Sequence, residues 1–512
     1  MPRTCRLTLC ILVLSGVRLL AQSGVLVEDV KLVSPQPQEG GWFGTAVSVS
    51  GDTLAVGAPH DDAGAGAIYV HVRSGGDWSL QATLKSPEPA DGFGAPLALS
   101  DDDLIVGVAD GAWVFVRAGT TWTPQAKLVT PQGTSPGDSV AIQGDTAIVG
   151  DLEADGEAGA AWFFLRTGTT WHLRAKLVAD DAHAHDGFSS ALALDGDTLA
   201  IGAWQADVGE SHDVGAIYVF VRTGLAWTQQ AKLVKLSAFP GASHGFGLAV
   251  ALSGGSVVAG ESYDSFAQDF SGAAYVYLRE GTTWAQQAKL KAPDPQIVAW
   301  FGGAVAIDGD SVVVGSRHAD QVGAAYVFGR TGTTWKPQAK LVASDGASGD
   351  GLGTDLAISG QTAVVGALQV NTSAENTGAA YLYTLPAPPP PTWSDLGSAL
   401  AGSQGLPELT GVGSLAPGTP VSLTLLDAHP FSTSMLVVGV ESLLVPFKGG
   451  TLVPVPDALV PLFTLGVGQA GLSAFWPAGV PSGQLIYLQC WTVDPTAPQQ
   501  LSASNALMAS VP

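Results

Sequence analysis

A segment of about fifty residues recurs along most of this chain, and this repetition limits the possible folds more than any other feature of the sequence. Each copy opens with a Phe-Gly pair or a variant of it, and most copies close with Ala-Lys-Leu shortly after a tryptophan. The openings are Phe43-Gly44, Phe93-Gly94, Gly137-Asp138, Phe188-Ser189, Phe246-Gly247, Phe301-Gly302 and Leu352-Gly353. The full closings begin at Ala126, Ala175, Ala231, Ala288 and Ala339. The chain is therefore a repeat protein.

Within one copy, apolar residues alternate with small or polar ones, which is the period of a β-strand. In the first copy such runs cover residues 45–50, 53–57, 66–73 and 80–84. The Gly51-Asp52 pair between the first two runs is typical of a two-residue hairpin. We therefore expect four antiparallel strands in each repeat. One such sheet cannot bury both of its faces, so neighbouring sheets must pack on one another.

The two ends of the repeat array predict that it closes into a ring. The seventh copy stops after its third strand, residues 378–383, and lacks a closing strand. A run that resembles a closing strand, residues 29–33, lies before the first Phe-Gly pair. Pairing this run with the last sheet would complete an all-β, seven-bladed β-propeller. The small residues of the first strands suit the crowded centre, and the tryptophans should pack between blades at the outer hairpins.

These motifs resemble the FG-GAP repeat family, known from the propellers of integrin α-subunits and from exported bacterial proteins. The resemblance covers residues 25–385, and Gly57-Ala58-Pro59 spells the second signature of the family in full. It implies a seven-bladed propeller with four-stranded antiparallel blades. Integrin-type blades often hold calcium in an Asp-rich loop between their first two strands. Here that loop is only a Gly-Asp hairpin, which leaves no room for such a site.

The chain begins like an exported protein. Residues 1–23 combine Arg3 and Arg6, an apolar run from 7 to 20 and a small-residue ending, as a signal peptide does. The apolar run is too short to predict a transmembrane segment. Removing residues 1–23 takes away Arg3, Arg6 and Arg18 and no acid, so 19 of the 22 basic residues remain against 45 acidic ones and the net charge becomes −26. We expect a secreted or cell-surface protein without a nucleic-acid partner.

A second domain follows the repeats. Residues 386–392 form a proline-rich linker, and residues 393–512 lose the repeat signature. Strand-like runs at 421–426, 434–440 and 485–493, separated by Pro/Gly turns, predict a small β-sandwich-like domain. Cys490 lies in the last of these runs and is the only cysteine left after removal of residues 1–23, so we expect a buried, unreactive thiol.

We expect ligand binding on one face of the propeller. The loops before the first strands and after the second strands share this face and carry the longest insertions. The candidate binding residues are Trp42, Trp204, His212, Asp213, Tyr263, Asp264, Phe266, Phe270 and Trp300. Exposed aromatic side chains are typical contact residues. The alternative is that these aromatic residues only cap the ends of the blades.

A second candidate site is a calcium loop at residues 151–156. Asp151, Glu153 and Asp155 supply oxygen atoms at alternate positions, and Gly156 occupies the sixth position, as in a calcium-binding loop. The twelfth position is Trp162, however, so the usual bidentate acid is missing. We therefore expect no cofactor, with calcium at these three residues as the alternative.

Three functions agree with the sequence. We expect a monomeric, non-catalytic module that binds an extracellular protein or glycan and serves adhesion. The first alternative is an extracellular hydrolase or lyase that uses the central opening of the propeller. The inner strands offer little for such chemistry beyond Asp355 and the strand-end residues Asp195 and Asp308. The second alternative is a structural surface protein without a specific ligand.

Overall fold

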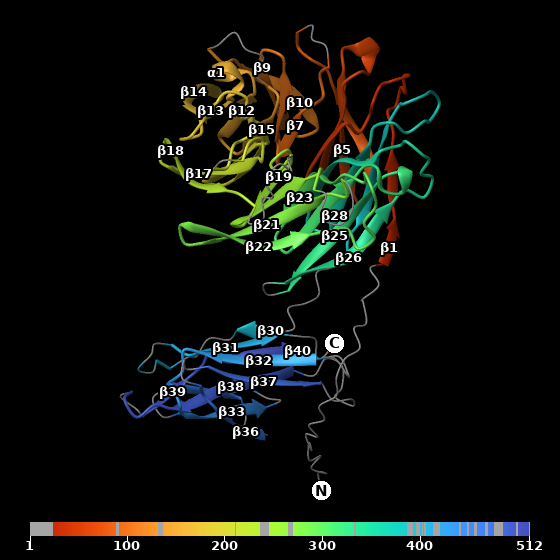
Figure 1. Ribbon diagram of the computed structural model, residues 1–512. Helices are drawn as coiled ribbons and strands as arrows, with labels where there is room; N and C mark the ends of the chain where they lie inside the picture. Colours follow the sequence, from red (N-terminus) through yellow and green to blue (C-terminus); the bar gives the residue numbers. More distant parts are fainter. Residues whose placement is uncertain are drawn as a thin grey trace. The chain divides into compact units, whose positions relative to one another are not determined.

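The structure is a computed structural model, shown in Figure 1. It describes residues 24–88, 92–131, 137–209, 211–235, 245–264, 270–331, 334–386, 393–395, 400–401, 403, 406–412, 420–439, 442–447, 450–454, 458–465, 469–475, 485–497 and 500–510. The predicted signal peptide at residues 1–23 lies outside this set, as does most of the predicted linker at 386–392. The chain divides into two compact units, a repeat unit within Ala21–Pro388 and a C-terminal unit within Pro389–Pro512.

The described residues of the repeat unit form seven antiparallel sheets, each of which contains four strands in the predicted order. The first strands are β3 (Ala46–Ser50), β7 (Leu97–Ser100), β11 (Val140–Gln143), β15 (Phe188–Asp195), β19 (Val250–Ser253), β23 (Phe301–Asp308) and β27 (Leu352–Ser359). The second strands are β4 (Thr53–Ala58), β8 (Asp103–Val108), β12 (Thr146–Asp151), β16 (Thr198–Ala203), β20 (Ser256–Glu261), β24 (Ser311–Ser316) and β28 (Thr362–Ala367).

The third strands continue each sheet outward. They are β5 (Ala67–Ser74), β9 (Gly111–Ala118), β13 (Ala160–Thr167), β17 (Ala216–Thr223), β21 (Ala273–Glu280), β25 (Ala324–Thr331) and β29 (Ala379–Thr384). The fourth strands are β6 (Asp77–Leu84), β10 (Thr121–Leu128), β14 (Thr170–Leu177), β18 (Ala226–Leu233), β22 (Thr283–Leu290), β26 (Thr334–Val342) and, in the last sheet, β2 (Val30–Leu32). A short helix, α1 (Ala154–Glu157), and two 3₁₀ turns at Asp62–Gly64 and Ala319–Gln321 lie in the loops.

The sheets follow one another around a common centre (Figure 1). Each first strand contacts the first strands of both neighbouring sheets, and β27 contacts β3, so the circle is closed. The first and last sheets also share one apolar core, in which Phe43, Val56 and Leu382 are buried. The backbones of the two sheets also approach closely at this junction. A Cβ atom on Gly366 would lie only 2.0 Å from the carbonyl oxygen of Gly44, so only glycine fits there. The unit is a propeller-like all-β fold.

The N-terminal strand closes the last sheet as predicted. β2 pairs antiparallel with β29, and Val30 lies opposite Leu382. The structure adds a strand that the sequence did not predict. β1 (Gly24–Val27) pairs parallel with β26, with Gly24 opposite Ala339, and extends the neighbouring sheet to five strands. The start of the described chain is therefore attached to two successive sheets.

The outer hairpins join neighbouring sheets, which confirms the predicted position of the tryptophans. Trp122 donates an indole hydrogen bond of 3.0 Å to Gln81 of the preceding sheet. Arg117 lies over the Trp122 ring, 5.4 Å from its centre, and donates to Thr53 of the preceding sheet at 2.8 Å. The same indole bond recurs in three more sheets, as Trp171–Gln125, Trp284–Gln230 and Trp335–Gln287.

The C-terminal unit consists of small antiparallel sheets. One contains β30 (Trp393–Asp395), β33 (Thr433–Gly439), β36 (Ala458–Phe463), β38 (Leu485–Val493), β39 (Leu501–Ala503) and β40 (Leu507–Ser510). A second contains β31 (Glu408–Val412), β32 (Pro420–Leu426) and β37 (Ala470–Phe475), and β34 (Ser442–Phe447) pairs with β35 (Gly450–Pro454). Leu425 of the second sheet shares an apolar core with Leu436 and Cys490 of the first.

Two further findings concern sequence predictions for these regions. Cys490 is completely buried, and burial raises the pKa of its thiol to about 12, as expected for an unreactive cysteine. Within the residues that the structure describes, no helix has the length and apolar character needed to cross a membrane.

Candidate functional site

The loops before the first strands and the loops after the second strands meet at one end of the sheets, which we call the loop face. In the first sheet, the rings of Trp42 and His60 contact edge to face with centroids 4.4 Å apart. The equivalent residues of the sixth sheet, Trp300 and His318, are also 4.4 Å apart. Backbone bonds hold both arrangements, since the N–H of His318 donates to the carbonyl of Ala299 at 3.3 Å. The two kinds of loop therefore lie together in both sheets.

Aromatic residues from two neighbouring sheets gather on the loop face around Trp300. The Tyr263 ring lies 5.8 Å from that of Trp300 and 6.1 Å from that of Phe270, in both cases edge to face. The guanidinium carbon of Arg317 lies 4.4 Å from the centre of the Trp300 ring. We name Tyr263, Phe270, Trp300 and Arg317 the Trp300 patch. Three of its members were predicted as binding residues, but Arg317 was not.

The backbone of this region adopts an unusual conformation. Phe270, Val298 and Trp300 have φ angles of 55°, 57° and 54°, in the left-handed region that non-glycine residues rarely occupy. Trp42 and Asp213, at equivalent positions of other sheets, have φ angles of 55° and 54°, so this conformation recurs among the repeats. Such residues persist only where the surrounding structure fixes them. Phe270 is 43% exposed, Ile297 is 64% exposed and Val298 is 42% exposed. The loops that carry Phe270 and Val298 therefore present apolar side chains to solvent.

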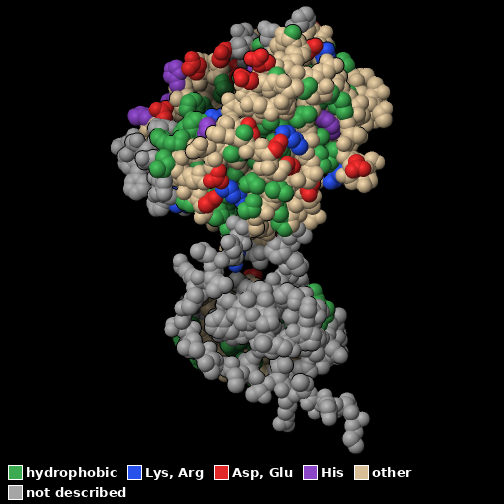
Figure 2. Space-filling view, turned by 90° about the vertical axis from the view of Figure 1, so that its right-hand side faces the viewer, with side chains coloured by type: hydrophobic (Ala, Val, Ile, Leu, Met, Phe, Trp, Pro, Cys, Tyr) green, Lys and Arg blue, Asp and Glu red, His purple; other side chains and the backbone are tan. Residues whose placement is uncertain are grey.

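Charge distinguishes Arg317 from most cations of the repeat unit. Figure 2 shows acidic and basic side chains beside one another in small groups, as expected from ion pairs such as Arg222–Asp197 and Lys340–Asp320. Arg317 forms no ion pair with any described residue. Burial lowers its pKa, and burial together with Arg317 lowers the pKa of His318. Both effects disfavour the charged form of His318, so Arg317 is the main positive charge of the patch.

The other predicted binding residues lie elsewhere or have other partners. Trp204, His212 and Asp213 belong to the loop after β16, and Asp207 of this loop accepts hydrogen bonds from His212 Nδ1 at 2.9 Å and the Asp213 N–H at 3.0 Å. The hydrogen bond with Asp207 raises the pKa of His212, whose ring is exposed. This group and the Trp300 patch therefore come from different sheets.

Asp264, predicted as a ligand contact, has partners within the repeat unit. Its carboxylate accepts a hydrogen bond of 2.9 Å from the Tyr275 hydroxyl and forms an ion pair with Lys289. Only 9% of the side chain is exposed. The sequence did not reveal these partners because they arrive from later strands. Phe266, also predicted to bind, lies outside the described residues.

The three predicted calcium ligands have separate surroundings. Asp151 is fully buried at the end of β12 and accepts a bond of 3.3 Å from the Trp162 indole. Asp155 accepts two bonds of 2.7 Å from Lys176. Glu153 precedes the helix α1 as its N-cap residue. Among the side chains that the structure describes, no three acids, histidines or cysteines gather closely enough to hold a metal ion.

The acids of the inner strands link neighbouring sheets. Asp355 accepts a bond of 2.7 Å from the Val47 N–H, Asp195 accepts one of 2.8 Å from Gly254, and Asp308 accepts one of 2.7 Å from Gly360. Burial raises the pKa of Asp355 to about 6, although backbone N–H donors oppose the rise. These carboxylates are thus hydrogen-bond acceptors between sheets.

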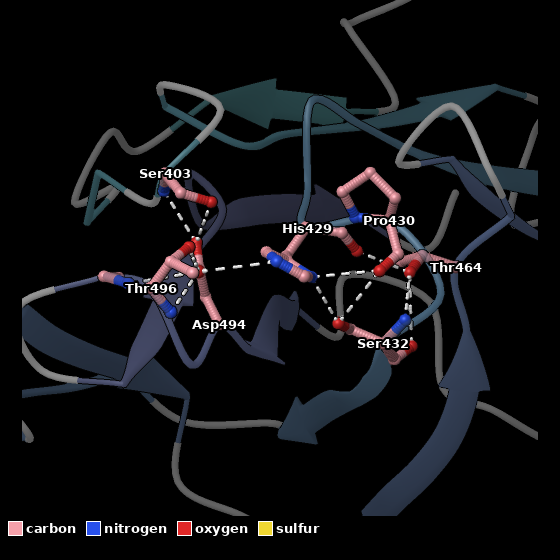
Figure 3. Close-up of polar contacts among 8 residues, drawn as sticks. Ser403, His429, Pro430, Ser432, Thr464, Asp494 and Thr496 are labelled. Atoms are coloured by element: carbon pink, nitrogen blue, oxygen red, sulfur yellow. Dashed lines mark hydrogen bonds and ion pairs between the residues drawn. The ribbon is translucent and has the colours of Figure 1, made fainter.

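The C-terminal unit contains a serine, a histidine and an aspartate close together (Figure 3). His429 Nδ1 lies 2.7 Å from Ser432 Oγ, but its Nε2 is 4.0 Å from Asp494 Oδ1, which is beyond hydrogen-bond range. Burial disfavours the charged form of Asp494, yet bonds from Ser403 and Thr496 outweigh it and lower its pKa to about 2. A serine-hydrolase triad needs a hydrogen bond between imidazole and carboxylate, and this group lacks it. The group instead ties loops together.

Of the comparisons with known proteins, the match to a family model agrees with the repeated sheets. No curated protein sequence matches this chain. One solved structure that resembles this chain comes from Bacteroides uniformis and is described as a candidate 6-phosphogluconolactonase. The two share 13% sequence identity, with a TM-score of 0.41. The match covers 59% of this chain and 86% of the other. A likeness at this level carries no argument about function. The model of the FG-GAP repeat matches residues 26–71, 171–220, 227–277, 284–328 and 335–383. The chain therefore contains five FG-GAP repeats that the family model recognises.

Proposed function

We propose that this protein is an exported, non-catalytic, seven-bladed β-propeller that binds a protein or glycan through its loop face. Each of the seven sheets would be one blade, and the C-terminal unit would be a β-sandwich-like accessory domain. Export is inferred from residues 1–23, and the closure of the ring by one chain is compatible with the monomer that we propose. The observation that carries the proposal is the Trp300 patch.

The composition of the patch supports recognition over a purely structural role. Tryptophan, tyrosine and arginine are the residues that contribute most often to binding energy at interfaces. Residues that only cap a blade would be expected to bury their apolar surface, whereas Phe270 and Val298 remain exposed in left-handed backbone conformations. A rigid ring of sheets would hold these loops in place before a partner arrives, which reduces the entropy lost on binding.

The test compares loop-face variants with a matched variant on the opposite face. Purified protein comprising residues 24–512 is screened on a glycan array and by pull-down from extracellular material. We expect Trp300→Ala and Phe270→Ala to weaken the binding found by about tenfold or more, as for interface hot spots. Leu225→Ala is the control, because Leu225 is 59% exposed in an outer hairpin between β17 and β18. Loss of binding in the Leu225 variant alone would contradict the proposal.

A further inference from the structure

The Trp300 patch combines a fixed positive charge with an apolar surround. Arg317 is stacked on Trp300, so the plane and position of the guanidinium are defined before any ligand arrives. Most of the arginines near the ends of the third strands have similar stacking but also a carboxylate partner. Arg330, for example, bonds Asp310 at 2.6 Å. Arg279 instead donates to the Gly281 carbonyl and the Thr198 hydroxyl. Arg317 lacks such a partner among the described residues, although the chain carries a net charge of −23.

The equivalent position in other repeats shows that Arg317 is peculiar to the sixth sheet. Each repeat has a Gly near the end of its second strand, and Arg317 is the second residue after Gly315. The residues two places after the corresponding glycines are Pro59, Ala109, Leu152, Trp204, Ser262 and Leu368. None of them is charged, so the repeat architecture does not require a cation here. A side chain that the repeat architecture does not require, and that forms no ion pair with a described residue, is available for a ligand.

We infer that the Trp300 patch binds a carboxylate on a polypeptide partner, with Arg317 as the residue that contacts it. A guanidinium recognises a carboxylate through paired hydrogen bonds. This inference rests on the proposed function of the loop face and names the class of partner. It gives Arg317 a role as a specificity-determining residue.

The geometry favours a polypeptide over an acidic glycan. A sugar ring would need an open aromatic face, but Arg317 lies over the Trp300 ring, and His318 and Tyr263 contact that ring edge to face. The remaining exposed surface includes the branched side chains of Ile297 and Val298, which are suited to apolar side chains of a protein. The partner therefore presents an Asp, a Glu or a C-terminal carboxylate next to an apolar residue.

The experiment uses the purified chain, residues 24–512, and two probes. The first is a displayed library of random twelve-residue peptides, and the second is polygalacturonate, a carboxylate-bearing glycan. Recovered peptides are synthesised with and without replacement of their acidic residue by the amide, and their Kd is measured by fluorescence anisotropy. The variants are Arg317→Gln, Arg317→Lys and, as a control of equal charge change, Lys336→Gln, since Lys336 is exposed on β26 after an outer hairpin. Circular dichroism melting confirms that each variant is folded.

We expect recovered peptides to contain an acid beside Leu, Ile, Val or Phe. Arg317→Gln should weaken binding by about tenfold or more, Arg317→Lys by less, and Lys336→Gln hardly at all. The amide peptide should bind the Arg317→Gln variant as weakly as the acidic peptide does, because the two changes remove the same interaction.

Other results overturn the inference. Recovery of no peptide, peptides without acids, or equal losses in the Arg317→Gln and Lys336→Gln variants would each contradict it. Binding of polygalacturonate without peptides would assign the patch to glycans, which refutes the inference and leaves the loop-face proposal intact. If peptides bind but Phe270→Ala and Arg317→Gln have no effect while Leu225→Ala abolishes binding, both the inference and the proposed function fail.

Discussion

Ser359 Oγ accepts a hydrogen bond of 3.1 Å from the backbone N–H of Gly51, across 308 residues of sequence. The same bond links other neighbouring sheets, for example Ser253 Oγ with the Gly309 N–H at 3.2 Å. In each case the last residue of a first strand holds the hairpin of the next sheet. The junction between the last and first sheets is therefore built like an internal junction.

This equivalence predicts the effect of removing the hydroxyl. Ser359→Ala should lower the free energy of unfolding by about 0.5–1.5 kcal/mol, the usual net value of one hydrogen bond. Ser253→Ala is the internal control and should cost a similar amount. Thermal unfolding of both variants measures the difference. A neutral Ser359→Ala beside a destabilised Ser253→Ala would mean that the ring is open in solution.

Asp264 should matter for stability and not for binding. Asp264→Asn removes the negative charge from its ion pair with the largely buried Lys289, so we expect a loss of about 2 kcal/mol in the free energy of unfolding. Ligand affinity at the Trp300 patch should change less than about twofold if the fold is kept. Melting temperature and Kd, measured on the same preparation, separate the two effects. A large loss of affinity with unchanged stability would identify Asp264 as a contact residue.

Asp355 should make stability depend on pH. Its pKa is about 6 in the folded protein, and an Asp in an unfolded chain has a pKa near 3.9. Between these values the folded state holds a proton that the unfolded state has released, so the free energy of unfolding falls as pH rises and then levels off above about 6. Asp355→Asn removes this penalty and should stabilise the protein by about 1–3 kcal/mol at pH 7.

The Asp355 measurement has an internal control. At pH 4 the wild-type carboxyl is largely protonated when folded, so the melting temperatures of the wild type and the Asp355→Asn variant should nearly coincide there. A variant that is equally stabilised at pH 4 and pH 7 would show that the gain has another cause.

Cys490 should be inert in the native protein. The thiol is fully buried and its pKa is raised to about 12, so iodoacetamide at pH 8 should not alkylate it. Addition of denaturant should allow complete alkylation, which intact mass spectrometry detects. Rapid labelling without denaturant would mean that β38 opens in solution.

The repeated architecture was predictable because its signals are local. Phe-Gly pairs, Gly-Asp hairpins and period-two runs each report on the conformation of a few residues, and seven copies reinforce one another. The attachment of residues 29–33 to the last sheet was also predictable, since the last copy lacks a fourth strand. By contrast, β1 contains only Gly24–Val27 and carries no repeat motif, so its parallel pairing with β26 left no sign in the sequence.

The candidate site was predicted only in part. Exposed aromatic residues before the Phe-Gly pairs pointed to Trp300, and the long insertion pointed to Tyr263 and Phe270. Arg317 was missed because its role depends on stacking against a residue seventeen positions earlier, although a charged residue at an otherwise uncharged repeat position was a usable signal. The ion pair of Asp264 with Lys289 was not visible because it depends on the register of β21 against β22.

Because β1 pairs with β26 and β2 pairs with β29, these two sheets can be completed only late in synthesis of the chain. Ribosomes deliver Gly24 and Val30 long before their partners Ala339 and Leu382. During synthesis these early strands therefore remain without their strand partners, and exposed unpaired strands favour aggregation and slow folding. A truncated product that ends before β29 would lack the partner of β2. Only a chain that extends through β29 can complete the last sheet.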